Sequence, residues 1–250
     1  MSAIGTYLYG FTDNHFKPDS SLCGLRNAPV RIVSFQDVAA VVSDHPVQKL
    51  LPMRSNLEPH HRIVHHIGLH HPLVPVAFGH IAEAEEQILT LVRENYDEIH
   101  DELGRLAGKV ELGIKLRWTA ENVFAYFVRT DRELRELRDR FFCNHEPSLE
   151  EKIQVGSLFE AKMNAERGRL SARLWTALDP AVCDRRTSAA RDEKTICNAA
   201  LLVERGRAHE FGLAMQAAAN LFDSNFALDY SGPWPAYSFV NLRLHAGLLL

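Results

Sequence analysis

The stretch Lys109-Val110-Glu111-Leu112-Gly113-Ile114-Lys115-Leu116-Arg117-Trp118 indicates the fold more clearly than any other part of the sequence. Every second residue in it is apolar, and the residues between are polar or glycine. A period of two is typical of a β-strand that buries one face and leaves the other to solvent. We therefore expect this strand to belong to a sheet that is covered on one side.

The segments after this strand have a recognisable order. A helical insertion is expected at about 121–147, and Ser148 with Glu151 then forms a capping box that begins a long helix toward Leu178. Two strands, a helix and a final strand are expected at 182–188, 194–203, 211–222 and 226–230. The order strand, helix, strand, strand, helix, strand predicts a ferredoxin-like domain over residues 108–250, with a Gly-Pro-Trp-Pro tail.

The segments before this strand predict a separate α+β domain over residues 1–107. Short strands are expected at 7–10, 30–35 and 38–42. A helix, an extended segment and a second, longer helix are expected at 56–69, 72–79 and 82–106. The predicted fold class is thus α+β with two domains, and such a fold does not by itself determine a function.

Composition excludes several classes of protein. The 250 residues include 28 basic and 32 acidic ones, for a formal net charge of -4, so the chain lacks the basic surface that nucleic acid requires. No apolar run approaches the roughly 20 residues of a membrane-spanning helix. The first residues do not resemble a secretory leader. We expect a cytoplasmic protein that binds neither nucleic acid nor membrane.

The common catalytic motifs are missing from the sequence. The run from Gly104 to Lys109 follows a helix, whereas a phosphate-binding loop joins a strand to a helix. There is no Gly-x-Ser-x-Gly nucleophile motif. We therefore expect no enzyme activity and no cofactor. A ligand-binding sensor is compatible with a ferredoxin-like domain, but no motif supports it.

Histidines are concentrated on the helix expected at 56–69. His61 and His65, and likewise His66 and His70, are spaced one helical turn apart. Imidazoles at this spacing can chelate zinc, copper or nickel, although a complete site needs further ligands. A solvated helix face with one or two hydrogen-bonded histidines is the simpler interpretation. A metal-binding protein or metalloenzyme based on these four residues is the alternative.

Near the end of the chain, the run Ser231-Gly232-Pro233-Trp234-Pro235 places a tryptophan between two prolines. Proline restricts its own backbone and that of the residue before it, so the Trp234 ring is held at low entropic cost. Trp234, Tyr237 and Phe239 could fasten the chain end onto the core of the carboxy-terminal domain. The same three aromatic residues could instead bind a partner, because rigid aromatic side chains are favoured at interfaces.

This run resembles the closing motif of the gas vesicle proteins of the GvpL/GvpF family, commonly Gly-Pro-Trp-Pro-Pro-Tyr-Ser-Phe, with Ala236 in place of one proline. Further matching segments occur in the expected order along nearly the whole chain. They are 7–10 (YLYG), a histidine-bearing helix around His61, 73–79 (LVPVAFG), 110–115 (VELGIK) and 198–203 (NAALLV). The sequence departs from the family at Ala77 and His80, where an arginine and a threonine are usual.

The resemblance implies an accessory protein associated with gas vesicles. Such a protein would assist assembly of the shell by binding the small hydrophobic shell protein and other accessory proteins. Exposed apolar faces and strand edges aggregate unless they are covered, which a folded protein could do by strand addition or with an apolar groove. The resemblance implies no catalytic residues.

Overall fold

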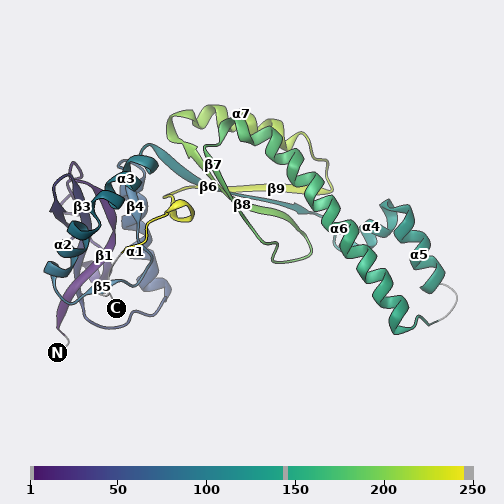
Figure 1. The fold of residues 1–250 in the computed structure, drawn as a ribbon, viewed down its shortest axis with the longest axis horizontal. Coiled ribbons are helices and arrows are strands. Elements are labelled where there is room, and N and C mark those ends of the chain that lie inside the picture. The colour runs from purple at the N-terminus through teal and green to yellow at the C-terminus, as the bar shows by residue number, and fades with distance from the viewer. Residues whose placement is uncertain (1–2, 143–145, 245–250) are drawn as a thin grey trace. The chain divides into compact units, whose positions relative to one another are not determined.

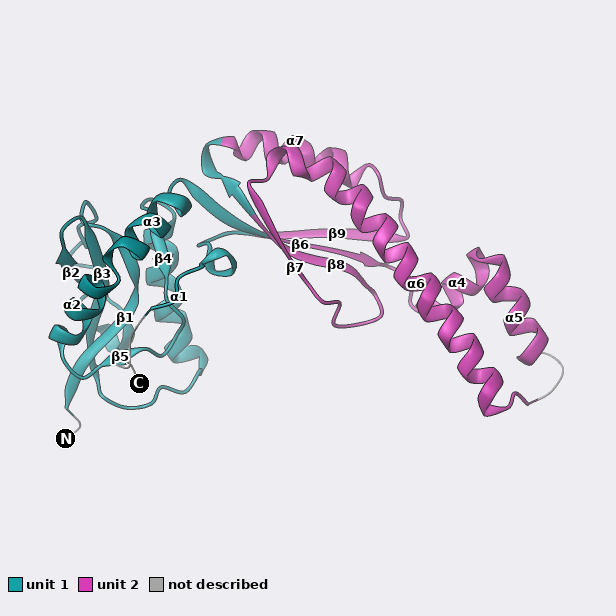
Figure 2. Cartoon of the chain, viewed as in Figure 1, with its two compact units in different colours: residues 1–112, 202–206, 232–250 teal, residues 113–201, 207–231 magenta. Residues whose placement is uncertain are grey.

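The chain forms two compact units, each built from segments that are separate in sequence (Figure 2). The structure is a computed structural model and describes residues 3–142 and 146–244. The first unit takes the residues up to 112, 202–206 and those from 232 onward. The second takes residues 113–201 and 207–231. The carboxy-terminal motif therefore belongs to the same unit as the amino-terminal strands.

An antiparallel sheet forms the centre of the first unit (Figure 1). Its strands are β1 (Ile4–Asp13), β2 (Arg31–Phe35), β3 (Val38–Pro46), β4 (Leu73–Pro75) and β5 (Ile81–Ala82). The order is β2-β3-β1-β4, and β5 also pairs with β1. Residues 5–12 of β1 are all buried, so both faces of this central strand are covered. The early strands expected from the sequence are confirmed.

Three helices pack against this sheet: α1 (Arg54–Gly68), α2 (Glu85–Glu94) and α3 (Tyr96–Leu106). The prediction of one continuous helix over 82–106 was wrong, because the helix is interrupted at Asn95. The Asn95 side chain is fully buried and its Nδ2 donates to the Leu91 carbonyl oxygen at 2.8 Å. A side-chain amide that bonds to the nearby backbone competes with the hydrogen bonds that would continue the helix. The sequence did not predict this break, because the spacing of apolar residues is helical on both sides of Asn95.

The second sheet consists of β6 (Lys109–Trp118), β7 (Asp184–Ser188), β8 (Thr195–Glu204) and β9 (Phe226–Trp234), in the order β7-β8-β6-β9. The Trp118 amide donates to the Lys194 carbonyl at 2.9 Å, so the end of β6 meets the start of β8 and the two strands are antiparallel. The expected alternation along β6 is confirmed, since its five apolar side chains are all buried.

Two helices join these strands: α6 (Leu149–Leu178) between β6 and β7, and α7 (Ala208–Ala219) between β8 and β9. With the sheet order, these connections give the predicted ferredoxin-like arrangement. The capping box that begins α6 is also present, because the Glu151 amide donates to Ser148 Oγ and Ser148 N–H donates to Glu151 Oε2. Short 3-10 helices lie at Leu25–Asn27, Asp179–Ala181, Arg205–Arg207 and Tyr237–Phe239.

The helical insertion expected at 121–147 contains α4 (Val123–Thr130) and α5 (Arg132–Phe142). The Asn122 side chain caps α4 by accepting a hydrogen bond from the Ala125 amide at 2.9 Å. Phe124 and Phe127 contact Phe159 of α6 edge-on, with ring centroids 5.2 and 5.7 Å apart. Residues 143–145 of the expected insertion lie outside the described residues.

Candidate functional site

The carboxy-terminal motif begins inside a strand. We expected the last strand to end near Tyr230, but β9 continues to Trp234 and includes Pro233. Since β9 comes last in the order β7-β8-β6-β9, it has a strand neighbour on one side only within the described residues. An edge strand tolerates proline because the missing N–H need not serve a neighbouring strand. Proline therefore did not end this strand as the sequence suggested.

Two glycines allow the motif to approach the rest of the first unit closely. Gly232 has a positive φ of 117°, and a Cβ there would lie 2.9 Å from the Glu111 carbonyl oxygen. Gly68, at the end of α1, faces Pro235, whose Cγ would be 3.1 Å from a Cβ on Gly68. Larger residues at either position would push the chain apart. The motif thus lies against both β6 and α1.

Past Pro235 the chain is anchored by two aromatic residues. The Phe239 side chain is completely buried. The ring of Tyr237 lies 6.1 Å from the ring of His61 and packs against the core cluster that contains Ile63 and Ile67 of α1. Burial raises the pKa of the Tyr237 hydroxyl above its ordinary value, so this group stays protonated. Tyr237 and Phe239 therefore both pack within the first unit.

Three charged side chains hold the backbone of the same segment. Glu111 accepts hydrogen bonds from the Ser238 amide and hydroxyl, each at 2.7 Å. Arg105 donates to the Phe239 carbonyl oxygen and is paired with Glu102 at 2.7 Å. Glu102 in turn accepts from the Asn241 amide at 2.7 Å. Hydrogen bonds to charged groups are stronger than neutral ones, so these contacts fix the path of the segment.

Trp234 differs from the other two aromatic residues of the motif. Its side chain is 48% exposed, and its ring lies 6.1 Å from the ring of His65 on α1. We expected Trp234 to pack against the core of the carboxy-terminal domain, but its ring contacts the amino-terminal helix and remains half in solvent. Of the three predicted partner-binding residues, only Trp234 presents a large apolar surface.

One histidine of α1 is part of the core. His60 is 1% exposed, and its Nδ1 lies 2.8 Å from the Tyr7 hydroxyl oxygen. The ring of His60 also stacks on that of Tyr9 at 5.7 Å. Burial, followed by the charge of neighbouring His61, lowers the pKa of His60 to about 4. His60 is therefore neutral near pH 7 and acts as a hydrogen-bonded core residue.

The remaining histidines of the series do not assemble a metal site. His61 faces Tyr237 and His65 faces Trp234, while the rings of His66 and His70 lie 6.1 Å apart. Among the described residues, no group of three or more His, Cys, Asp or Glu side chains is placed to hold a metal ion. The metal-binding alternative thus gains no support from the geometry, since a histidine pair alone supplies too few ligands.

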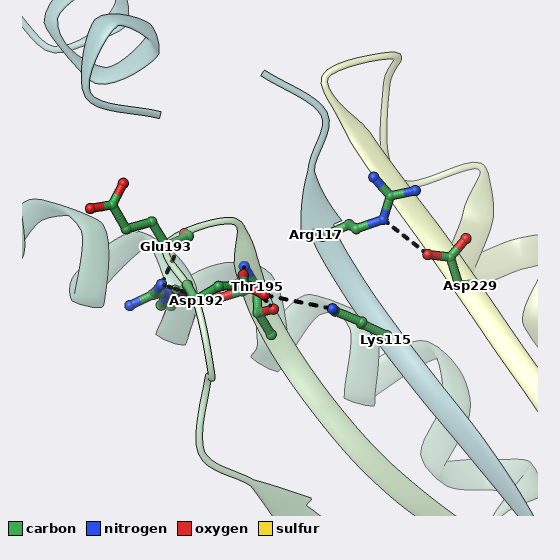
Figure 3. Close-up of polar contacts among 7 residues, drawn as sticks. Lys115, Arg117, Asp192, Glu193, Thr195 and Asp229 are labelled. Carbon is green, nitrogen blue, oxygen red and sulfur yellow. Dashed lines mark hydrogen bonds and ion pairs between the residues drawn. The ribbon is translucent and has the colours of Figure 1, made fainter. Parts of the chain in front are cut away.

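A second polar surface lies on the sheet of the second unit. Figure 3 shows Arg117 of β6 paired with Asp229 of β9, and Lys115 directed at Asp192. The nitrogen–oxygen distances of these two pairs are 3.0 and 3.8 Å. Asp192 also accepts from the Thr195 amide and hydroxyl, and these hydrogen bonds lower the pKa of its carboxyl group. Lys115 and Arg117 thus each have an acidic neighbour.

Arg167 of α6 fixes the loop that carries Asp192. Its guanidinium donates to the backbone carbonyls of Asp192, Glu193 and Thr195 at 3.0–3.1 Å. The same group lies over the Trp118 ring, with its central carbon 5.6 Å from the ring centroid. These contacts connect a helix, a loop and a strand, so they explain the local fold and supply no reactive group.

Residues 5–241 match the family described as gas vesicle synthesis protein GvpL/GvpF. The chain belongs to this family. A gas vesicle protein F of Dolichospermum flosaquae is 27% identical over 244 residues, with 96% of this chain and 99% of that protein covered. A gas vesicle protein F of a Streptomyces species is 27% identical over 240 residues, covering 95% and 100%.

Crystal structures of two GvpF proteins have the same fold. The structure from Anabaena sp. PCC7120 gives a TM-score of 0.85 at 22% identity, covering 97% of this chain and 100% of that one. The structure from Microcystis aeruginosa gives 0.80 at 23% identity, covering 95% and 99%. The resemblance to the GvpL/GvpF family inferred from the closing motif is therefore confirmed.

Membership of the GvpL/GvpF family identifies a gas vesicle protein and provides no support for a metalloenzyme. In the described part of the chain, no helix is long and apolar enough to cross a membrane. Sequence reasoning missed the residues that contact the motif, above all Glu111, which accepts its hydrogen bonds, and Gly68, which leaves room for Pro235. Glu111 occupies a polar position of an alternating strand, and nothing local distinguishes it from a solvated residue. Its partner, Ser238, is distant in sequence.

Proposed function

We propose that this protein assists assembly of the gas vesicle shell by binding the small hydrophobic shell protein, and that it works together with other accessory proteins while associated with gas vesicles. The observation that carries the proposal is the family match over residues 5–241. It is a binding function, for which the chain needs no catalytic group and no cofactor.

The unpaired side of β9 is the surface that we assign to the shell protein. Residues 229–234 are exposed, and Tyr230 and Trp234 are 64% and 48% exposed. They lie on either side of Gly232, so the strand presents two large aromatic side chains beside an open edge. Tyrosine and tryptophan are enriched at the centres of interfaces, and an open edge can add a further strand.

Pro233 limits how far such pairing could extend. Proline has no N–H to donate, so an incoming strand would pair with the residues before position 233. Trp234 would then contact side chains of the bound segment beyond the last backbone hydrogen bond. This geometry suits a short apolar segment, as expected for a small hydrophobic shell protein whose apolar faces need cover before assembly.

The proposal is tested by co-expressing the shell protein with this chain and measuring how much shell protein stays soluble and co-purifies. We expect clear capture by the natural sequence. Replacing both aromatic residues, Tyr230→Ala with Trp234→Ala, should reduce capture about tenfold or more, as loss of interface aromatic residues commonly does. The single substitution Leu213→Ala is the control and should leave capture unchanged, because Leu213 is 55% exposed but belongs to α7 and not to β9.

Two results would contradict the proposal at different levels. If the natural chain neither captures the shell protein nor keeps it soluble, and its deletion leaves buoyant vesicles unchanged, the function is wrong. If capture is normal but survives loss of Tyr230 and Trp234, the function stands and the assignment of the β9 surface is wrong.

A further inference from the structure

The first half of α6 has an exposed strip that no other described part of the chain covers. Leu149 and Ile153 are 75% and 57% exposed, and Lys152, Gly156 and Glu160 are exposed beside them. These five residues are three or four apart, so they share one helix face. The strip extends for about 17 Å along the helix axis. Exposed leucine and isoleucine one turn apart form an apolar surface suited to another helix.

Gly156 lies in the middle of this strip. A Cβ at Gly156 would meet no described atom within 4 Å, so no contact with the described residues requires a glycine here. Glycine inside a helix costs about 1 kcal/mol relative to alanine. A glycine on an exposed face allows a second helix to approach the backbone closely, as small residues do at helix crossings. A second helix that crosses at Gly156 would therefore explain why a glycine occupies this position.

The charges around Gly156 are arranged symmetrically. Lys152 lies four residues before it and Glu160 lies four residues after it. Within the described residues, neither side chain has an ion pair or hydrogen bond. If two copies of α6 cross antiparallel at Gly156, Lys152 of each copy lies opposite Glu160 of the other. The strip is therefore complementary in charge to itself under a two-fold rotation.

We propose that this face of α6 is a self-association surface, on which a second copy of the chain packs antiparallel with the two helices crossing at Gly156. Leu149 and Ile153 are covered in both copies, and two Lys152–Glu160 contacts set the orientation. The contact is isologous, so it closes as a dimer and does not propagate. It lies within the second unit and is independent of the β9 surface that we assign to the shell protein.

The dimer should be weak. A single pair of short helix faces buries less than the roughly 1,200 Å² of a standard stable interface, which places it among transient contacts. Analytical ultracentrifugation of the full chain, from about 10 µM to about 500 µM, should therefore show a reversible monomer–dimer equilibrium. A chain that remains monomeric over the whole range overturns the proposal.

Charge reversal tests the orientation. Either Lys152→Glu or Glu160→Lys places like charges opposite each other twice, and we expect the dimer to weaken about tenfold or more. The double variant Lys152→Glu/Glu160→Lys restores both opposite-charge contacts and should return to within about threefold of the natural affinity. If the single reversals have no effect, or if the double variant stays as weak as the singles, the antiparallel arrangement is wrong.

Gly156 has a matched control in the same helix. Gly168 is also exposed, and a Cβ there would likewise meet no atom within 4 Å. Gly156→Arg should abolish the dimer, because two arginines would meet at the crossing point, whereas Gly168→Arg should leave it intact. Circular dichroism should show equal helix content in the two variants. Equal loss of dimer in both would refute the crossing at Gly156.

Discussion

The two halves of the carboxy-terminal motif differ in almost every physical respect. Residues 230–234, the outer half, lie on an edge strand and expose their side chains, including two large aromatic ones. Residues 235–241, the inner half, contain the fully buried Phe239 and accept or donate hydrogen bonds to Glu111, Arg105 and Glu102. A motif that is continuous in sequence thus combines a buried, hydrogen-bonded segment with an exposed one.

This difference shows that a sequence motif shared by a family can contain residues with different roles. The inner half explains why the run should be kept for folding, because its contacts hold strand β6, α1 and α3 together in one unit. The outer half is not required by these contacts, so its exposed aromatic residues need another reason. Substitutions in the two halves should therefore differ in their effects on stability.

The largest loss of stability is expected from Phe239→Ala. The side chain is completely buried, and removing a buried phenylalanine ring costs about 3–5 kcal/mol in the free energy of unfolding. Equilibrium urea unfolding measures this change. Tyr230→Ala in the outer half is the control and should cost well under about 1 kcal/mol. Equal losses would remove the distinction between the two halves.

His60 lies on α1, the helix against which the inner half packs, and it should make the free energy of unfolding depend on pH. Its pKa is about 4 in the folded protein, against about 6.5 for an unfolded histidine. Between these values the unfolded chain binds more protons, so lowering the pH from 6.5 to 4 should reduce the free energy of unfolding by at most about 3 kcal/mol.

The test compares urea unfolding of the natural chain and of His60→Gln across this pH range. The variant should lose the His60 contribution to the pH dependence, although it is less stable near pH 7. His66→Gln, an exposed histidine of the same helix, should retain the dependence of the natural chain. A dependence that is the same in all three proteins would show that His60 is not the responsible group.

A smaller effect is expected from Glu111→Gln. The amide can replace only one of the two carboxylate oxygens that accept from Ser238, and the site is partly solvated, so we expect a loss of about 1 kcal/mol. Ser238→Ala removes only the hydroxyl contact and should cost less. Thermal unfolding of both variants gives this order, and the reverse order would mean that Glu111 does not hold the inner half.

Among Trp234, Tyr237 and Phe239, the smallest change in stability is expected from Trp234→Ala. The ring is 48% exposed and its ring contact is with His65, so its removal should cost less than about 1 kcal/mol by urea unfolding. A loss as large as that of Phe239→Ala would instead make Trp234 a structural residue, as the sequence alone suggested.

Local patterns predicted much of the fold. The alternation along β6 and the capping box of Ser148 and Glu151 were correct, because each follows from residues close together in sequence. The interruption at Asn95 was missed, since the apolar stripe continues on both sides of it. The end of β9 was placed too early, because a proline is permitted where a strand has only one neighbour and the sequence does not reveal which strands are at an edge.

Less of the candidate site than of the fold could be predicted from the sequence. The three aromatic residues were identified, but which of them would remain exposed depends on α1 and β6, which are far from the motif in sequence. The histidine pairs had the correct helical spacing for chelation, yet His61 and His65 face aromatic rings of the motif. The spacing of histidines along one helix shows which of them share a face of that helix, but it does not show which other residues pack against that face.

The burial of Phe239 within the first unit also has a consequence for biosynthesis. The strands β1 to β5 of the first unit are synthesised early, but the core of that unit lacks the Phe239 side chain until translation has reached residue 239. By then residues 113–201 and 207–231 of the second unit have already been synthesised. The usual order, in which the amino-terminal domain is complete before the next one emerges, is therefore not available to this chain. The second unit can begin to fold while the first is still unfinished on the ribosome.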